Sequence, residues 1–267
     1  MRRLSENWAY YNLTVMKLIA FCFLLVIAPS VGLACSCIFG SGCWSPSGEG
    51  VEFVGTPTAV HSTRDGVAVD FTVSEAFGRS NSKFHVENFT PQGPTTLSVY
   101  EHFDNCGYSF RLGVEYFVSA NSFESKLWTS ICSQTRPAIA AAALIRQARA
   151  IRDGKPPARL FGFVGVEPDP GVSPLSRLEA KPTASVVVIA VGRTGEFRTT
   201  TAADGSFEFT RLPESTYHLR LELPKDVFIW RASDKLKREY AVSPGKICEA
   251  DFSLYLKDDP FAVNQPR

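Results

Sequence analysis

The sequence predicts a mainly β protein that consists of a five-stranded module, a helix and a second module of about seven strands. Three observations lead to this prediction: five strand-like segments within about 100 residues, an alanine-rich helical pattern after them, and strand patterns without helices in the second half. The chain has 267 residues. Without an N-terminal leader it is long enough for about two domains of the usual ~100–150 residues.

The first module is predicted from alternation at the period of a strand. In the segment Gly66–Ala76, four apolar residues alternate with smaller or polar ones, and they are Val67, Val69, Phe71 and Val73. This pattern is typical of a half-buried strand. The other strand-like segments are Glu52–His61, Thr95–Glu101, Glu115–Asn121 and Lys126–Ile131. Five short strands separated by Gly, Pro and Asn fit a small barrel or a sandwich.

A helix is predicted for Pro137–Arg152, because the segment is rich in alanine, a strong helix former. Its apolar residues recur at helical spacing, and they are Ile139, Leu144, Ala148 and Ile151. Gly154 and the pair Pro156-Pro157 end the helix. We expect its three arginines to form a solvated stripe, made of Arg146, Arg149 and Arg152.

The second module begins at Ala158, where strand patterns resume. Its strand-like segments are Leu160–Val166, Ser185–Val191, Phe197–Thr201, Ser206–Thr210, Tyr217–Leu223 and Glu249–Leu256. Turn signals such as Asp204-Gly205 separate them. These features predict a sandwich of about seven strands.

Residues 1–34 are expected to be a signal peptide. The apolar run Leu18–Ala28 follows Lys17, and small residues stand in Gly32-Leu33-Ala34, so cleavage after Ala34 would leave Cys35 as the first residue. Met16 is an alternative start of translation. The apolar run has eleven residues, too few to span a bilayer, and no later stretch reaches the roughly 20 that a spanning helix needs. We therefore expect a secreted, periplasmic or envelope protein with no transmembrane segment in its mature chain.

The cysteines favour disulfides. The leader carries Cys22, and six cysteines remain: Cys35, Cys37, Cys43, Cys106, Cys132 and Cys248. An even number suits disulfides in an oxidising compartment. Zinc ligation is the alternative, but the chain lacks paired Cys-x-x-Cys motifs and its four histidines are scattered. We expect no cofactor and no metal bound to the protein alone.

Charge and motifs exclude further classes. Residues 1–34 hold three basic side chains and one acidic one, so the mature net charge is −1 and no nucleic-acid partner is expected. The chain has no His-Glu-x-x-His, no Gly-x-Ser-x-Gly and no phosphate-binding glycine loop, so an enzyme is not predicted. Asn88-Phe89-Thr90 is a glycosylation acceptor only if the host glycosylates.

Four motifs occur in one order in the first module: Cys35-Ser36-Cys37, Phe53-Val54-Gly55-Thr56-Pro57, Cys106-Gly107-Tyr108 and Thr129-Ser130-Ile131-Cys132. This order resembles the inhibitory domain of the tissue inhibitors of metalloproteinases, a netrin-like module built on an OB-type barrel. The resemblance covers residues 35–136, with residues 137–157 as a helix and a Pro-rich linker. It implies a five-stranded barrel with a C-terminal helix, and the disulfides Cys35–Cys106 and Cys37–Cys132.

The second module, residues 158–258, carries the motifs Gly162-Phe163-Val164, Ala184–Val191, Thr199–Phe209 and Leu212–Tyr217, and residues 259–267 form a tail. These motifs resemble the carboxypeptidase regulatory-like modules, which have a prealbumin-like β-sandwich fold. Ser215 stands where that family usually has glycine. Because the motifs are mostly turn chemistry and core alternation, the resemblance implies a fold and no activity.

One cysteine pair departs from the inhibitor family, which has a third disulfide within its first module. Cys43 fits the first member of that bridge, but no second member appears before Pro156. Cys248 is the cysteine that remains. Either Cys43–Cys248 joins the two modules, or both thiols are free or pair with other chains.

The resemblance also implies a mechanism. A catalytic zinc keeps one open position for water, and the free amine and carbonyl oxygen of Cys35 would chelate the zinc of a target metalloendopeptidase and expel that water. Ser36 would point toward the primary specificity pocket, with Asn105 and Gly107 forming a flanking ridge. The α-amine has an ordinary pKa of about 7.7–8.0, so zinc must displace a proton and binding improves at higher pH.

Two other interpretations stay open. Many netrin-like modules share this framework without inhibiting proteases, so the chain is alternatively an exported scaffold or binding protein, associated with a cell envelope. A lipid on Cys35 is the third interpretation, although Leu33 stands one place too late for a good bacterial lipobox. Lipidation would exclude the inhibitory mechanism, because an acylated amine cannot chelate zinc.

Overall fold

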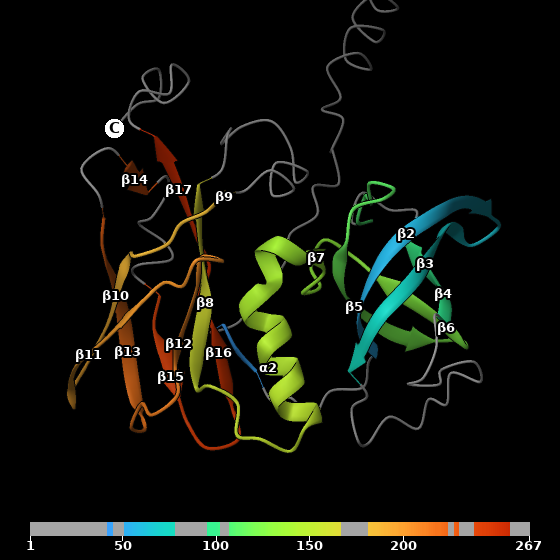
Figure 1. Ribbon diagram of the computed structural model, residues 1–267. Coiled ribbons are helices and arrows are strands. Elements are labelled where there is room, and N and C mark those ends of the chain that lie inside the picture. The colour runs from blue at the N-terminus through green and yellow to red at the C-terminus, as the bar shows by residue number, and fades with distance from the viewer. Residues whose placement is uncertain are drawn as a thin grey trace, which may run out of the picture. The chain divides into compact units, whose positions relative to one another are not determined.

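The computed structural model describes residues 42–44, 51–77, 95–101, 107–166, 181–223, 227–229 and 238–256. These residues form mainly β structure and one α-helix with a preceding 3-10 turn (Figure 1). No helix among them is long and apolar enough to cross a membrane.

The first half forms a closed barrel, which decides between the two architectures that the sequence left open. Its strands are β2 (Val51–Thr63), β3 (Gly66–Phe77), β4 (Thr95–Glu101), β5 (Tyr116–Phe123) and β6 (Lys126–Thr129). They pair in the order β2-β3-β4-β6-β5, and β2 also pairs with β5, which closes the ring (Figure 1). The short β7 (Arg136–Pro137) pairs with β5 outside the ring.

Barrel closure depends on the curvature of β2, which pairs with β3 along most of its length and with β5 through its first residues. Its register with β3 shifts between Val54 and Gly55 and again between Pro57 and Ala59. Such irregularities bend a strand and increase its twist. Gly55 is suited to the bend because a Cβ there would lie 3.0 Å from the carbonyl oxygen of Thr72. The Gly-Thr-Pro interruption in this strand is therefore the corner of the barrel.

The barrel core confirms the predicted alternation from Val69 onward, whereas Val67 is only partly buried and its neighbour Ala68 is buried. Val69, Phe71 and Val73 are buried, while the residues between them are more exposed. The rings of Phe53 and Phe71 meet edge to face with centroids 5.5 Å apart. Burying each side chain of this size stabilises the fold by about 1.5–3 kcal/mol relative to exposure.

The predicted helix consists of a 3-10 turn, η1 (Ala138–Ala141), followed by α2 (Ala142–Arg152). Ile139 was expected on the apolar face, but it is 49% exposed because it lies in the 3-10 turn, where the helical phase differs. Leu144 and Ala148 are buried as predicted. They belong to a hydrophobic cluster with Phe117 from the barrel and Phe161 from the second half. The helix is thus part of a shared core as well as a connection.

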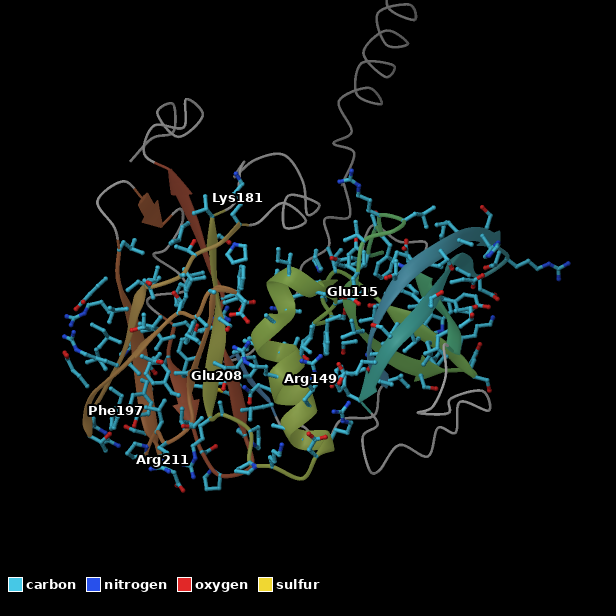
Figure 2. All side chains as sticks on the ribbon, viewed as in Figure 1. Glu115, Arg149, Lys181, Phe197, Glu208 and Arg211 are labelled. Atoms are coloured by element: carbon cyan, nitrogen blue, oxygen red, sulfur yellow. A yellow bond between two sulfur atoms is a disulfide. The ribbon has the colours of Figure 1, made fainter. Side chains whose placement is uncertain are left out.

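The arginines of α2 do not form the solvated stripe that the sequence predicts. Arg149 and Arg152 pair with Glu75 on β3, at 2.6 and 2.7 Å. Arg146 pairs with Asp204 and Glu208, each at 2.7 Å. Figure 2 shows Arg149 on α2. The stripe therefore joins the helix to the barrel on one side and to the second half on the other, which helical periodicity cannot reveal.

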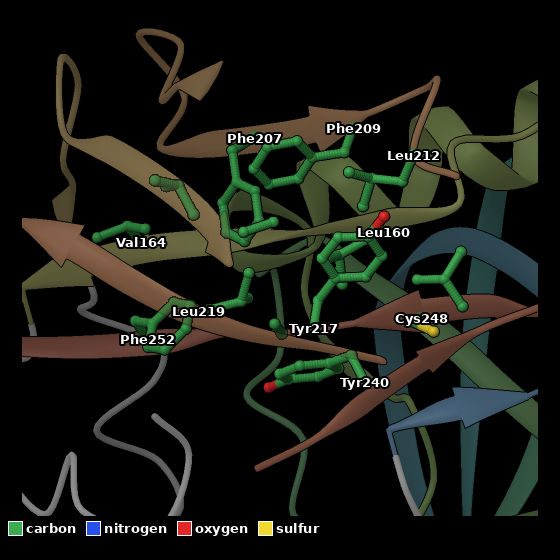
Figure 3. Packing of buried hydrophobic residues seen from close by; sticks show 14 of the residues in the cluster. Leu160, Val164, Phe207, Phe209, Leu212, Tyr217, Leu219, Tyr240, Cys248 and Phe252 are labelled. Atoms are coloured by element: carbon green, nitrogen blue, oxygen red, sulfur yellow. The ribbon is translucent and has the colours of Figure 1, made fainter. Parts of the chain in front are cut away.

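The second half contains two sheets. The larger has the path β1 (Cys43–Trp44), β16 (Ile247–Glu249), β8 (Leu160–Val166), β17 (Phe252–Leu256) and β14 (Val227–Ile229), with β9 (Lys181–Pro182) and β12 (Ser206–Phe209) also on β8. The smaller has the order β11 (Gly195–Thr200), β10 (Val187–Gly192), β13 (Ser215–Glu222) and β15 (Tyr240–Val242). One hydrophobic cluster takes side chains from both sheets, including Leu160, Phe207 and Phe252 from the first and Tyr217, Leu219 and Tyr240 from the second (Figure 3). The prealbumin-like form of this half stays a prediction.

Strand β1 comes from the part of the sequence that was assigned to the first module. Its two residues pair antiparallel with β16, with Cys43 opposite Cys248 and Trp44 opposite Ile247. A segment of two residues has no measurable period, so periodicity cannot predict this strand. The N-terminal part of the described chain thus contributes an edge strand to a sheet of the second half.

Candidate functional site

Most residues of the predicted inhibitory terminus lie outside the described residues. These are Cys35, Ser36, Cys37, Asn105 and Cys106. The predicted signal peptide (residues 1–34), the predicted tail (residues 259–267) and the glycosylation acceptor Asn88 also lie outside the described residues. Gly107, Cys132, Cys43 and Cys248 are described. The candidate site is therefore built from the part of the barrel that leads to and follows these cysteines.

Strands β4 and β6 end next to each other. They pair in parallel, with Val99 opposite Leu127 and Glu101 opposite Thr129. Glu101 and Thr129 are the last residues of their strands, and parallel strands that are in register end at the same edge of a sheet. Cys106 follows β4 in the sequence, and Cys132 follows β6. The two segments that carry the partner cysteines of the predicted terminus therefore start from neighbouring strand ends.

Cys132 lies in a tight turn after β6. It is disulfide-bonded, and its partner is outside the described residues. The Cys132 amide donates to Oγ of Ser130 at 3.2 Å, and the Ser133 amide donates to the Ser130 carbonyl at 3.0 Å. Serine hydroxyl groups often accept hydrogen bonds from backbone amides two residues further along in such turns. Hydrogen bonds within residues 130–133 thereby hold the backbone at Cys132.

Two buried threonines attach this turn to β5. The Thr129 hydroxyl donates to the Ser119 carbonyl at 3.1 Å, and the Ser119 amide donates to Oγ1 of Thr135 at 3.0 Å. The two threonine hydroxyls lie 2.8 Å apart, and Oγ of Ser133 lies 2.9 Å from Oγ1 of Thr129. A buried polar network of this kind is rigid when its members are satisfied. The segment between Thr129 and Thr135 is consequently a fixed support for Cys132.

The segment after Gly107 is held by aromatic packing. The ring of Tyr108 lies 4.8 Å from that of Phe110 and 6.0 Å from that of Tyr116, and Phe110 in turn meets Phe71 at 4.8 Å. The Tyr108–Tyr116 and Phe110–Phe71 pairs are edge to face, and such pairs add about 0.5–1.5 kcal/mol each beyond their burial. The chain that follows Cys106 is therefore anchored to the barrel core, a role that the sequence analysis did not assign to Tyr108 or Phe110.

Burial raises the pKa of Glu101 to about 7, at the end of β4. The ordinary value is 4.5, so the folded protein holds this proton more tightly than the unfolded chain does. Ionisation of Glu101 therefore lowers the free energy of unfolding. The loss begins as the pH rises above 4.5 and is complete above about 7.

We expect Glu101→Gln to stabilise the protein at pH 8 and to leave it nearly unchanged at pH 4.5. Gln carries no charge at either pH, so the difference should be roughly 1–2 kcal/mol at pH 8 after allowance for solvent screening of a half-buried group. Urea unfolding at both pH values measures it. Glu214→Gln is the control, because Glu214 is exposed, and a substitution at such a surface position should change the unfolding free energy by less than about 0.5 kcal/mol. A pH-independent effect of Glu101→Gln would contradict the raised pKa.

Cys43 and Cys248 form a disulfide with an S–S distance of 2.04 Å. Of the two alternatives that the sequence left open, the structure contains the bridge between the modules. Cys248 is fully buried, and Cys43 packs against the same hydrophobic cluster. The neighbouring Glu249 amide donates to the Gly42 carbonyl at 2.8 Å, so both covalent and backbone contacts hold the segment 42–44.

A buried arginine joins the barrel to the second half. Nη1 of Arg136, on β7, lies 2.7 Å from Oε1 of Glu249 and also pairs with Asp251. Only 8% of Arg136 is exposed. Burial by itself lowers the pKa of Arg136, but the two carboxylates outweigh it and hold the pKa above the usual arginine value. Sequence reasoning missed this cluster because its members are more than 100 residues apart and form no motif.

Comparison with protein-family models and with curated proteins finds no match for this chain. Among the described residues, no group of three or more His, Cys, Asp or Glu side chains is placed to hold a metal ion.

Proposed function

We propose that this protein is an exported inhibitor of zinc metalloendopeptidases, similar to the tissue inhibitors of metalloproteinases, and that its free N-terminal Cys35 chelates the target's zinc. The observation that carries the proposal is the closed barrel on which β4 and β6 end side by side, with a disulfide-bonded cysteine following β6. The four motifs require neighbouring strand ends of this kind, because Cys106 and Cys132 are the proposed disulfide partners of Cys35 and Cys37.

In this mechanism the barrel supplies rigidity and the terminus supplies chemistry. The amine nitrogen and carbonyl oxygen of Cys35 would form a five-membered chelate ring on the zinc and replace its water. Ser36 would enter the primary specificity pocket, where a small side chain fits many enzymes. Asn105 and Gly107 would contact the protease beside the chelate. Because disulfides fix the terminus in advance, little conformational entropy is lost on binding.

The second half is proposed to be a prealbumin-like sandwich of the carboxypeptidase regulatory-like type. Support comes from the two sheets that share one hydrophobic cluster. The fold by itself implies no particular activity.

We expect protein that begins at Cys35 with an unblocked amine to inhibit several zinc endopeptidases. The test is an inhibition screen with protein whose N-terminus has been verified by mass, at pH 7 and pH 8.5. Inhibition should strengthen at the higher pH, since less of the amine is protonated there.

Two outcomes would count against this function. An acylated Cys35, or a start several residues away, removes the chelating group. A panel of proteases that remains fully active with correctly processed protein favours the exported scaffold instead. Non-reducing peptide mapping is an independent check, because the proposal requires Cys35–Cys106 and Cys37–Cys132.

A further inference from the structure

The smaller sheet of the second half has an open edge at β11. Among the described residues, β11 pairs only with β10, which leaves its outer side without a partner strand (Figure 1). The other edge of this sheet is β15, which has three residues, whereas β11 has six. Proteins commonly keep an edge strand from pairing with other chains by shortness, proline, a bulge or an inward-pointing charge. Strand β11 has none of these four features.

Alternate residues of β11 direct their backbone groups to this open edge. In an antiparallel strand the amide and carbonyl of one residue point to the same neighbour, and those of the next residue point to the opposite side. Directly after β11, the Thr201 amide donates to the Val186 carbonyl at 2.9 Å, and the Thr201 carbonyl accepts from the Ser185 amide at 3.0 Å. Thr201 therefore faces the segment that leads into β10, as do the residues two and four positions before it. The backbone groups of Glu196 and Arg198 consequently point away from β10.

A second copy of the chain fits this edge in one antiparallel register. With a two-fold axis at Phe197, Glu196 of each copy lies opposite Arg198 of the other, and these are the residues whose backbone groups point outward. Opposite charges that face each other across two strands are favourable, and like charges are unfavourable. An axis at Glu196 or at Arg198 would place like charges opposite each other. An axis between two residues would pair outward-facing backbone groups with inward-facing ones.

The side chains on both faces of β11 suit this register. Glu196 and Arg198 lie on the exposed face, with 46% and 55% of their side chains exposed, so both can reach across the edge. On the other face, Phe197 packs against the hydrophobic cluster and meets the ring of Tyr217 edge to face at 5.9 Å (Figure 2). The two Phe197 residues would form a pair without hydrogen bonds between them, the type of pair in which side chains are closest. Aromatic pairs across two strands stabilise a sheet.

We propose that β11 is a homodimerisation edge, through which two copies of this chain join their smaller sheets into one continuous sheet. The charge pattern identifies the occupant, because Glu196 and Arg198 complement themselves under a two-fold rotation. Only residues 195–199 of each copy overlap, so the interface is smaller than a standard stable one, and we expect a dissociation constant on the order of 100 μM. The proposal does not rest on the inhibitory function, since it involves neither the barrel nor the cysteines.

The test is sedimentation equilibrium of the full chain from about 10 μM to about 1 mM, the range in which an interface of this size associates. Glu196→Arg places like charges opposite each other at two symmetric positions, and it should raise the dissociation constant at least roughly tenfold. Adding Arg198→Glu to this variant exchanges the two charges and restores their attraction. The dissociation constant should then return to within about threefold of the wild-type value.

Glu239→Arg is the matched control. It makes the same change of charge on a side chain that is 67% exposed and that directly precedes β15, at the other edge of the sheet. It should leave the dissociation constant unchanged. Thermal melting checks that each variant is folded at the assay temperature. An unchanged dissociation constant for Glu196→Arg, or an equal rise for Glu239→Arg, would overturn the proposed register.

Hydrogen exchange of single amides locates the interface directly. In the monomer the Phe197 and Thr199 amides face β10, whereas the Glu196 and Arg198 amides face solvent. Where the dimer forms, exchange of the Glu196 and Arg198 amides should slow by roughly tenfold or more, while exchange of the other two changes little. A chain that stays monomeric up to about 1 mM overturns the proposal, and so does a dimer in which these two amides exchange as in the monomer. An inhibition screen bears on the proposed function alone.

Discussion

A single alanine placed ahead of Cys35 should abolish inhibition of zinc endopeptidases while the protein stays folded. The extra residue converts the α-amine into an amide, which has no free lone pair for zinc, and it moves the chelating carbonyl out of place. We expect the inhibition constant to rise by roughly 100-fold or more, since each 1.4 kcal/mol of lost binding free energy is about a factor of ten. The measurement is the inhibition constant against the protease that wild-type protein inhibits best.

The matched control carries one extra alanine after Arg267, at the other end of the chain. It should inhibit as wild type does. Both extended proteins should melt within about 1 °C of wild type, because a surface change away from packed groups has little effect on stability. Undiminished inhibition by the N-terminally extended protein would show that Cys35 does not chelate the zinc.

Replacing Arg136 by Met should cost about 3–5 kcal/mol of unfolding free energy, the usual price of removing one partner from a buried ion pair. Only 10% of the Arg136 side chain is exposed, and its loss leaves Glu249 and Asp251 without this cation. Urea unfolding at pH 7 measures the change. Combining Arg136→Met with Glu249→Gln and Asp251→Asn should recover part of the loss, because both carboxylates are then replaced by neutral amides and no acidic charge faces the missing guanidinium.

The control for this substitution is Arg198→Met. Arg198 also lies near two carboxylates, those of Glu222 at 3.1 Å and Glu196 at 3.9 Å, but its side chain is 55% exposed. Exposed ion pairs contribute about 0–1 kcal/mol, so the loss should be much smaller. Equal effects of the two substitutions would contradict a structural role for burial of the Arg136 cluster.

Strand positions were predictable because they depend on local periodicity. The alternation of Val69, Phe71 and Val73 is visible in the sequence and buried in the structure. Barrel closure was not predictable, because it depends on the register shifts around Gly55 that let one strand pair with two partners. A Gly-Thr-Pro break signals an irregularity but does not say which strand it brings into contact.

The support of the candidate site was less predictable than the fold. Arg136 pairs with carboxylates more than 100 residues away, and no local pattern marks such a partner. Strand β1 has two residues, too few to show any period. The arginines of α2 have helical spacing whether they contact water or a carboxylate, so their partners could not be predicted. The positions of the cysteines did predict the disulfide Cys43–Cys248, as one of two alternatives.

The bridge between Cys43 and Cys248 spans 205 positions of the chain, and this separation has a consequence for biosynthesis. Cys43 emerges from the ribosome, and from any translocation channel, long before its partner exists. During that interval its thiol meets the other early cysteines, so wrong pairings form readily and must be exchanged later. Maturation should therefore depend on a thiol–disulfide isomerase and finish only after synthesis of the last strands.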